Sequence, residues 1–139
     1  MSYWETPHVG GVKEETMATP PLGSILLGTT DPHRLRDWYA AAFAPEGEGF
    51  SEVSPTMFAA NFGDVGVLID GRTDVGERNP EPGRVILNFH VEDARATADR
   101  LNRLGVTWLT ELEEREGGLF GTLVDPDGNY IQIIQLKEG

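Results

Sequence analysis

The sequence contains no cysteine among its 139 residues. This absence excludes a disulfide framework, a thiolate zinc site and a cysteine nucleophile, and it fits a cytoplasmic protein. The sequence also has no apolar run that approaches the roughly 18 residues of a membrane-spanning helix. Its first residues lack the basic start and the apolar run of a signal peptide. We therefore expect a soluble protein.

Basic residues are scarce. Eleven Lys and Arg stand against 23 Asp and Glu, which gives a net charge of -12. Such a charge repels phosphate backbones and anionic lipid, so neither nucleic acid nor a membrane is an expected partner. The acids could form a groove for a cationic ligand, or they could only keep the protein soluble, and their spread along the chain favours solubility.

Two stretches of the chain share one pattern, a short strand followed by an acidic cap and a helix. One is SILLGTTDPHRLRDWYAAAF at residues 24–43, and the other is VILNFHVEDARATADRLNRL at residues 85–104. The alignment of Asp31 with Asp93, 62 positions later, also aligns the apolar positions on both sides of the cap. Self-similarity of this kind predicts two copies of one structural module.

Each module is predicted to be a βαβββ unit, and together they form one α+β domain over residues 24–136. The modules cover residues 24–70 and 84–136, and the charged, Gly- and Pro-rich stretch at 71–83 is the linker. The helices begin after Asp31 and Asp93, and the first places Leu35, Trp38, Tyr39 and Ala42 on its core face. Strands are expected at 24–28, 49–53, 56–62, 65–69, 84–91, 106–112, 118–124 and 129–136.

Residues 1–23 precede the first module as an arm without apolar periodicity. The arm carries one pair of large aromatic residues, Tyr3 and Trp4. Two neighbouring aromatics in a polar tail usually dock somewhere, and the alternatives are the same domain, a second chain or a pocket.

The modules, the Trp38–Tyr39 pair and the motif DPDGNYIQIIQ at residues 125–135 resemble the vicinal oxygen chelate superfamily. That superfamily includes glyoxalase I, extradiol dioxygenases, fosfomycin-resistance transferases and bleomycin-resistance proteins. The resemblance covers roughly residues 24–136. It implies that the curled mixed sheets of the two modules form a shared cup, with ligands on the concave face and helices outside.

The resemblance also implies where a metal would be held. Metal-dependent members place a His in the first strand of each module and a Glu in the last strand of each. These positions fall on Ser24, Ile86 and Gln132, and on Asp70 or Leu68 according to an offset of 62 or 64. Isoleucine cannot ligate, and a hydroxyl and a neutral amide are weak ligands for transition metals. We predict no metal, no cofactor and no assigned catalytic residue.

Strand alternation then identifies side chains that share the cup. If Ile86 points inward, so do Asn88 and His90, while Leu87 and Phe89 pack beneath the helix. Trp108 and Phe120 are either core residues or aromatics that stack on a ligand. The predicted ligand-binding residues are Ser24, Asp70, Asn88, His90, Trp108, Phe120, Tyr130 and Gln132.

His90 either serves as a general base or ligand contact, or closes a strand by bonding to a neighbouring carbonyl. The leading hypothesis is a metal-free protein that binds or sequesters a small organic molecule, akin to the bleomycin-resistance branch. Pockets in that branch lie at the subunit boundary, which implies a homodimer. The alternative is a lyase or isomerase acting on a small oxygenated metabolite through His90, with or without a metal at Asp70, Gln132 and His90. A pocket without an evolved ligand is the third possibility.

Overall fold

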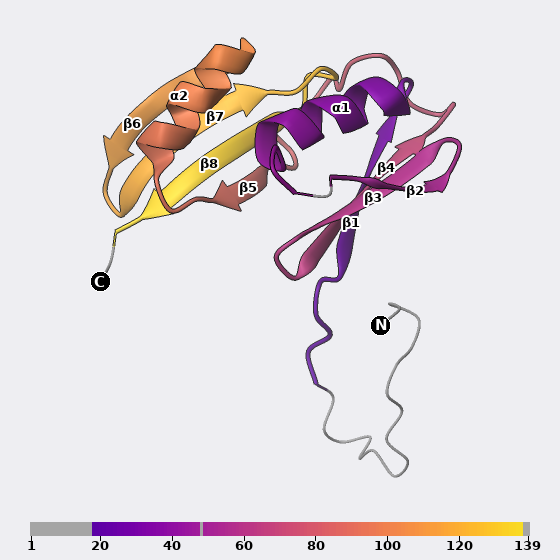
Figure 1. The fold of residues 1–139 in the computed structure, drawn as a ribbon, viewed down its shortest axis with the longest axis horizontal. Helices are drawn as coiled ribbons and strands as arrows, with labels where there is room; N and C mark the ends of the chain where they lie inside the picture. The colour runs from indigo at the N-terminus through magenta and orange to yellow at the C-terminus, as the bar shows by residue number, and fades with distance from the viewer. Residues whose placement is uncertain (1–17, 48, 138–139) are drawn as a thin grey trace.

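The computed structural model describes residues 18–47 and 49–137, so the aromatic pair Tyr3 and Trp4 lies outside the described residues. The described chain is α+β and has the two predicted βαβββ modules (Figure 1). The first module contains β1 (Ser24–Thr29), α1 (Pro32–Phe43), β2 (Ser51–Ser54), β3 (Met57–Phe62) and β4 (Val65–Gly71). The second contains β5 (Leu87–His90), α2 (Ala94–Leu104), β6 (Thr107–Arg115), β7 (Gly118–Val124) and β8 (Tyr130–Leu136).

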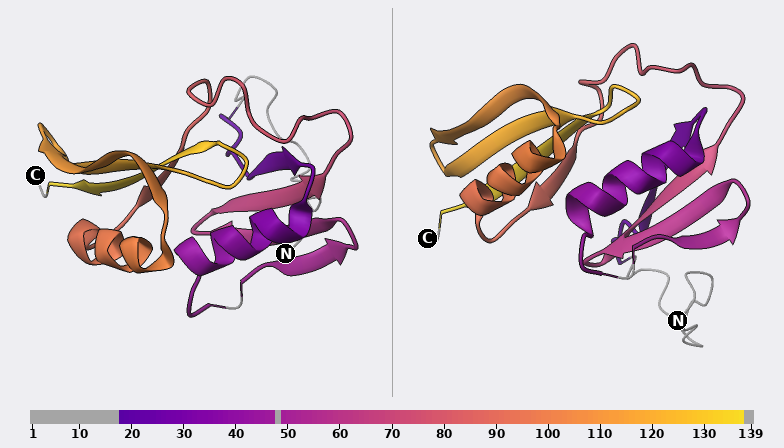
Figure 2. Two further views of the ribbon diagram at one scale, coloured as in Figure 1. Left: turned by 90° about the horizontal axis from the view of Figure 1, so that it is seen from above. Right: turned by 45° about the horizontal axis from the view of Figure 1, so that its top comes forward.

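Each module forms one mixed four-stranded sheet. The strand orders are β1-β4-β3-β2 and β5-β8-β7-β6, so the first and last strands of each module lie side by side. These pairs, β1 with β4 and β5 with β8, are parallel, and the other pairs are antiparallel. The two sheets lie next to each other, and each carries its own helix (Figures 1 and 2).

The helices begin at the predicted caps. The Asp31 carboxylate accepts a hydrogen bond from the Arg34 amide at 3.1 Å, and the Asp93 carboxylate accepts one from the Ala96 amide at 3.1 Å. The second helix ends at Gly105, whose φ of 80° closes the helix in the left-handed region. Neither helix of the described chain is long and apolar enough to cross a membrane.

The core lies between the helices and the sheets and runs through both modules. Tyr39, Ile69, Leu101 and Ile131 are fully buried. The remaining buried members of the cluster are Leu35, Ala42, Val67, Leu87, Ala98, Leu123 and Ile133. Leu35, Tyr39 and Ala42 are the buried residues of α1, as the helical spacing predicts.

The strand that opens the second module is shorter than expected. The predicted strand began at Arg84, whereas β5 pairs with β8 only from Leu87 to His90. Val85 and Ile86 precede the ladder and are exposed, at 67% and 38%. The prediction included Val85 and Ile86 because they are apolar, but neither residue pairs with a neighbouring strand.

Candidate functional site

One face of the second sheet gathers most of the predicted ligand-binding residues. Asn88 lies opposite Gln132, which lies opposite Thr122, so these side chains form one row across three strands. His90 and Phe120 flank Ile134 in the next row. Tyr130 shares this face by strand alternation. The structure therefore brings Asn88, His90, Tyr130 and Gln132 onto one surface, as predicted from the parity of the strands, and Phe120 lies on the same surface.

The other three predicted residues lie elsewhere. Ser24 is exposed at the start of β1, and Asp70 lies on β4, with its carboxylate 3.5 Å from the Arg72 guanidinium. Trp108 pairs with Leu123 on the helix face of the second sheet. Its indole Nε1 donates to Asn102 Oδ1 of α2 at 2.7 Å, so it packs on the side away from the cup face.

The pairing register decides which residue of the first module corresponds to Gln132. Leu26 and Asn88 are equivalent at the offset of 62, and they pair with Leu68 and Gln132 respectively. Leu68, and not Asp70, therefore occupies the carboxylate position. The metal positions implied by the resemblance then hold Ser24, Leu68, Ile86 and Gln132, a set with no imidazole and no carboxylate. The residues present do not fit a divalent metal of that type. No group of three or more His, Asp or Glu suited to a metal occurs in the part of the chain that the structure describes.

A cleft of about 620 Å³ lies between the modules. We call it the inter-module cleft. On one side it is bounded by β5 and α2, and on the other by β1, the end of α1 and the β3–β4 hairpin. Its lining residues are Leu22, Ile25, Phe43, Phe62, Gly63, Val65, Val67, Ile86, Leu87, Asn88, Phe89, His90, Val91, Thr97 and Arg100.

Three phenyl rings form much of this lining. The Phe43 and Phe89 rings are stacked, with centroids 3.9 Å apart and planes 5° apart. Phe62 meets Phe89 edge to face at 5.2 Å and 84°. Sequence reasoning missed these rings as site residues, because they come from α1, β3 and β5 and only the packing of the two modules brings them together.

The polar groups of the cleft are few. The side chains of Asn88 and His90 are exposed on the cleft wall and have no hydrogen-bond partner within the described chain. Arg100 donates to the carbonyls of Ala41 at 3.0 Å and Ala42 at 2.5 Å, at the C-terminus of α1. The arrangement suits an apolar organic molecule with a few polar substituents.

A second pocket of about 520 Å³ shares Ile25 and Leu87 with the first. It lies beneath the linker, which contributes Asp74, Val75 and Asn79. Tyr130, one of the predicted ligand-binding residues, lines this pocket and not the inter-module cleft.

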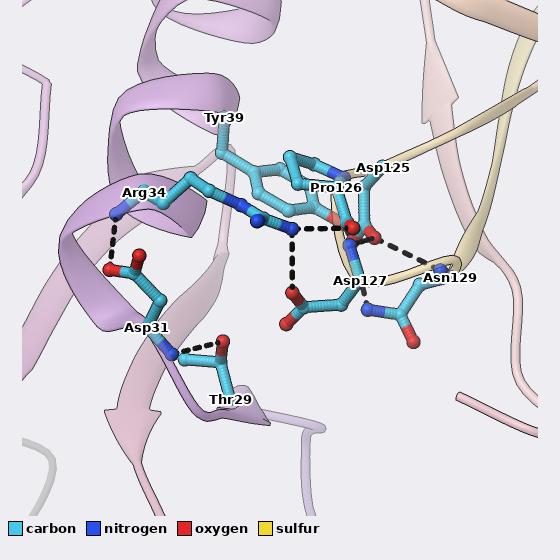
Figure 3. A network of polar contacts seen from close by, with 8 residues as sticks. All are labelled: Thr29, Asp31, Arg34, Tyr39, Asp125, Pro126, Asp127 and Asn129. Carbon is cyan, nitrogen blue, oxygen red and sulfur yellow. Dashed lines mark hydrogen bonds and ion pairs between the residues drawn. The ribbon is translucent and has the colours of Figure 1, made fainter. Parts of the chain in front are cut away.

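A buried polar network joins the two modules beside this second pocket (Figure 3). The Tyr39 hydroxyl on α1 donates to Asp125 Oδ2 at 2.7 Å, in the turn between β7 and β8. The same carboxylate accepts from the amides of Asp127 and Asn129 and from the Asn129 side chain, at 2.8 to 2.9 Å. Arg34 donates to the Pro126 carbonyl at 2.7 Å. The turn that sequence reasoning identified only as a strand connection is therefore also the anchor of α1.

Burial in this network changes the acidity of its members. Desolvation and the neighbouring Asp125 carboxylate raise the pKa of the Tyr39 phenol well above its usual 10.0. Desolvation also raises the pKa of Asp127 above its usual 3.8, and the hydrogen bond from Thr29 opposes that shift. The network therefore holds a neutral phenol against a buried carboxylate, and its role is structural. His90 lies outside this network, in the lining of the inter-module cleft.

Comparison with known proteins agrees with this architecture. Residues 24–134 match the family model described as a Glyoxalase-like domain. An antibiotic-binding protein, TnmS3 from Streptomyces sp. CB03234, superposes with a TM-score of 0.67 at 20% identity, covering 87% of this chain and 99% of that one. A glyoxalase/bleomycin resistance protein/dioxygenase family enzyme from Burkholderia phytofirmans PsJN gives 0.67 at 17% identity, covering 85% and 100%. A glyoxalase/bleomycin resistance protein/dioxygenase from Nocardioides gives 0.71 at 14% identity, covering 89% and 88%. A search of curated proteins gave no significant match.

Proposed function

Because this chain belongs to the Glyoxalase-like domain family, within the vicinal oxygen chelate superfamily, we propose that it binds a small organic molecule in the inter-module cleft. The observation that carries the proposal is the cleft itself. Its volume of about 620 Å³ lies within the range of roughly 300–1,000 Å³ that is usual for small-molecule sites. Its lining is mostly apolar, and two unpartnered polar side chains, Asn88 and His90, supply orientation.

We also propose that the ligand is held without a metal ion, as in a bleomycin-resistance-like sequestering protein. The support is the donor set at Ser24, Leu68, Ile86 and Gln132, in which only a hydroxyl and an amide remain. The likeness to an antibiotic-binding protein agrees with a sequestering role. The absence of cysteine agrees with action in the cytoplasm.

A homodimer is part of this proposal, with the arm at residues 1–23 contributing to association. Exposed apolar side chains border the cleft on both sides, with Leu22 at 67% and Ile86 at 38%. Deletion of residues 1–20 is expected to weaken self-association in analytical ultracentrifugation. A dimer of unchanged affinity would remove that role for the arm.

The second candidate function is a lyase or isomerase reaction with His90 as the general base. The observation that favours it is the position of the His90 imidazole, exposed on the cleft wall and free of any partner within the described residues. This hypothesis requires a pH-dependent activity that His90→Ala abolishes while the fold stays intact.

The test of binding is a screen of a small-molecule library by two-dimensional amide NMR of the labelled protein. Shifts are expected to cluster at the amides of β5 and the β3–β4 hairpin. Thr97 lines the cleft from α2, so Thr97→Trp should fill it and weaken each hit about tenfold or more.

The matched control is Ala96→Trp, the adjacent exposed position, which does not line the cleft. It should leave affinities unchanged. Hits that are equally insensitive to Thr97→Trp, or that shift only amides elsewhere, would contradict binding in the inter-module cleft.

A further inference from the structure

The lining of the inter-module cleft contrasts with the charge of the whole molecule. The chain carries 23 acids, yet none of the described residues that line the cleft is an Asp or a Glu. The second pocket, by comparison, includes both Asp74 and Asp127. Among the residues that line the cleft, Arg100 has the charged side chain and His90 is the other titratable residue.

The charge of Arg100 is not neutralised by a carboxylate. Its guanidinium bonds to the backbone carbonyls of Ala41 and Ala42, which carry only the partial negative charge of the C-terminus of α1, and no ion pair involves it among the described residues. It is also partly buried. Its positive field is therefore screened less than that of a fully exposed side chain.

The shape of the wall favours a flat ring. Phe89 stacks on Phe43 and lies edge to face with Phe62, so the cleft lining contains an aromatic cluster that a further ring can extend. Aromatic pairs in stacked or edge-to-face arrangements are stabilised beyond what the burial of area alone supplies, which favours an aromatic ligand.

The free edge of β5 adds hydrogen-bonding groups. The Val91 amide donates to the Ile134 carbonyl of β8 at 2.8 Å, so in this parallel pair the odd-numbered residues of β5 bond to β8. The backbone groups of Asn88 and His90 then point to the edge that has no partner strand in the sheet. The Asn88 side-chain amide can donate and accept as well.

From these features we infer that the inter-module cleft selects planar aromatic molecules that carry oxygen substituents and are neutral or anionic, and that it disfavours cations despite the net charge of the protein. The inference rests on the proposed function, because it names the ligand class of the same cleft. It reverses the order of preference that the overall charge suggests.

Three probes with one ring system test the charge preference: naphthoate, naphthol and naphthylmethylammonium. Each is titrated near neutral pH into the full chain, followed by amide NMR at β5. Naphthoate and naphthol are expected to bind at least tenfold more tightly than the ammonium, as a rough estimate for one partly screened charge. An ammonium that binds as well as naphthoate would overturn the ligand class while leaving binding in the cleft intact.

The nearly isosteric substitution Asn88→Asp places a carboxylate in the cleft. It should weaken naphthoate roughly tenfold relative to naphthol and strengthen the ammonium relative to naphthol. Asn61→Asp, at the exposed position of β3 and outside the lining, is the matched control and should change none of the three.

Two further outcomes separate the two proposals. If none of the probes binds at about 1 mM but other library compounds shift the β5 amides, the ligand class is wrong and the cleft still binds small molecules. If no compound of any kind shifts these amides, both proposals fail.

Discussion

Tyr39 connects the two modules through one hydrogen bond to Asp125, 86 positions later in the chain. Helical spacing placed Tyr39 on the core face of its helix, and the DPDGN motif placed Asp125 in a turn, and both placements are confirmed. The bond between them could not be predicted, because local patterns identify a buried position without identifying its distant partner.

Removal of this hydroxyl should lower stability. Tyr39→Phe leaves the ring packing in place and takes one donor from the buried Asp125, whose other three donors remain. The expected loss is about 1–2 kcal/mol of unfolding free energy, measured by urea denaturation. Tyr130→Phe is the matched control, since the Tyr130 hydroxyl has no hydrogen bond within the described residues and its loss should change stability little. Equal effects of the two substitutions would contradict the role of the network.

The raised pKa of Tyr39 predicts how the stability of the protein changes with pH in the alkaline range. The folded pKa of Tyr39 lies above its usual 10.0, so the folded state resists ionisation that the unfolded chain permits. The stabilising contribution is therefore fully present below that usual value and is lost as the pH rises through the folded pKa. Above pH 10.0, the unfolding free energy of the Tyr39→Phe variant should fall less steeply with pH than that of the unmodified protein. Parallel curves would show that Tyr39 ionises alike in both states.

At the scale of elements, helices were predicted more closely than strands. Asp31 with Pro32, and Asp93 with Gly105, are local signals that fix where the helices begin and where the second one ends, and the structure confirms them. Strand ends depend on the partner instead. β5 stops where β8 stops pairing with it, and β6 continues to Arg115, beyond the predicted limit at residue 112, because β7 pairs with it as far as Gly118.

The Asp93 cap can be tested within one helix. Asp93→Ala removes the acceptor of the Ala96 amide and should cost about 1 kcal/mol of unfolding free energy in urea denaturation. Asp99→Ala, at an exposed position in the interior of α2, is the matched control and should be neutral or slightly stabilising. If Asp93→Ala lowers the unfolding free energy no more than Asp99→Ala does, the packing of α2 alone defines where this helix begins.

At the scale of the whole molecule, the internal repeat predicted the topology but not the site. The repeat offset is 62 at the first strands and 64 at the last strands, where Gln132 is equivalent to Leu68, because the segments between helix and last strand differ in length in the two modules. That slip of two residues moves the predicted position from Leu68 to Asp70. The cleft depends on how the modules meet, as the stacking of Phe43 on Phe89 illustrates, and no periodicity within one module contains that information.

Metal binding can be measured through the thermal stability of the whole protein. A metal that binds only the folded state adds about 2.7 kcal/mol of stability at a hundredfold excess over its Kd, which is several degrees in melting temperature. With Ser24, Leu68, Ile86 and Gln132 as the available groups, we expect Mn, Fe, Ni and Zn salts to leave the melting temperature of chelator-free protein unchanged. The combined variant Ser24→His, Ile86→His and Gln132→Glu restores donors of the metal-dependent type and serves as the positive control, in which a rise is expected. Stoichiometric metal in the unmodified protein, with a rise abolished by His90→Ala, would instead favour the lyase or isomerase function and a site built around His90.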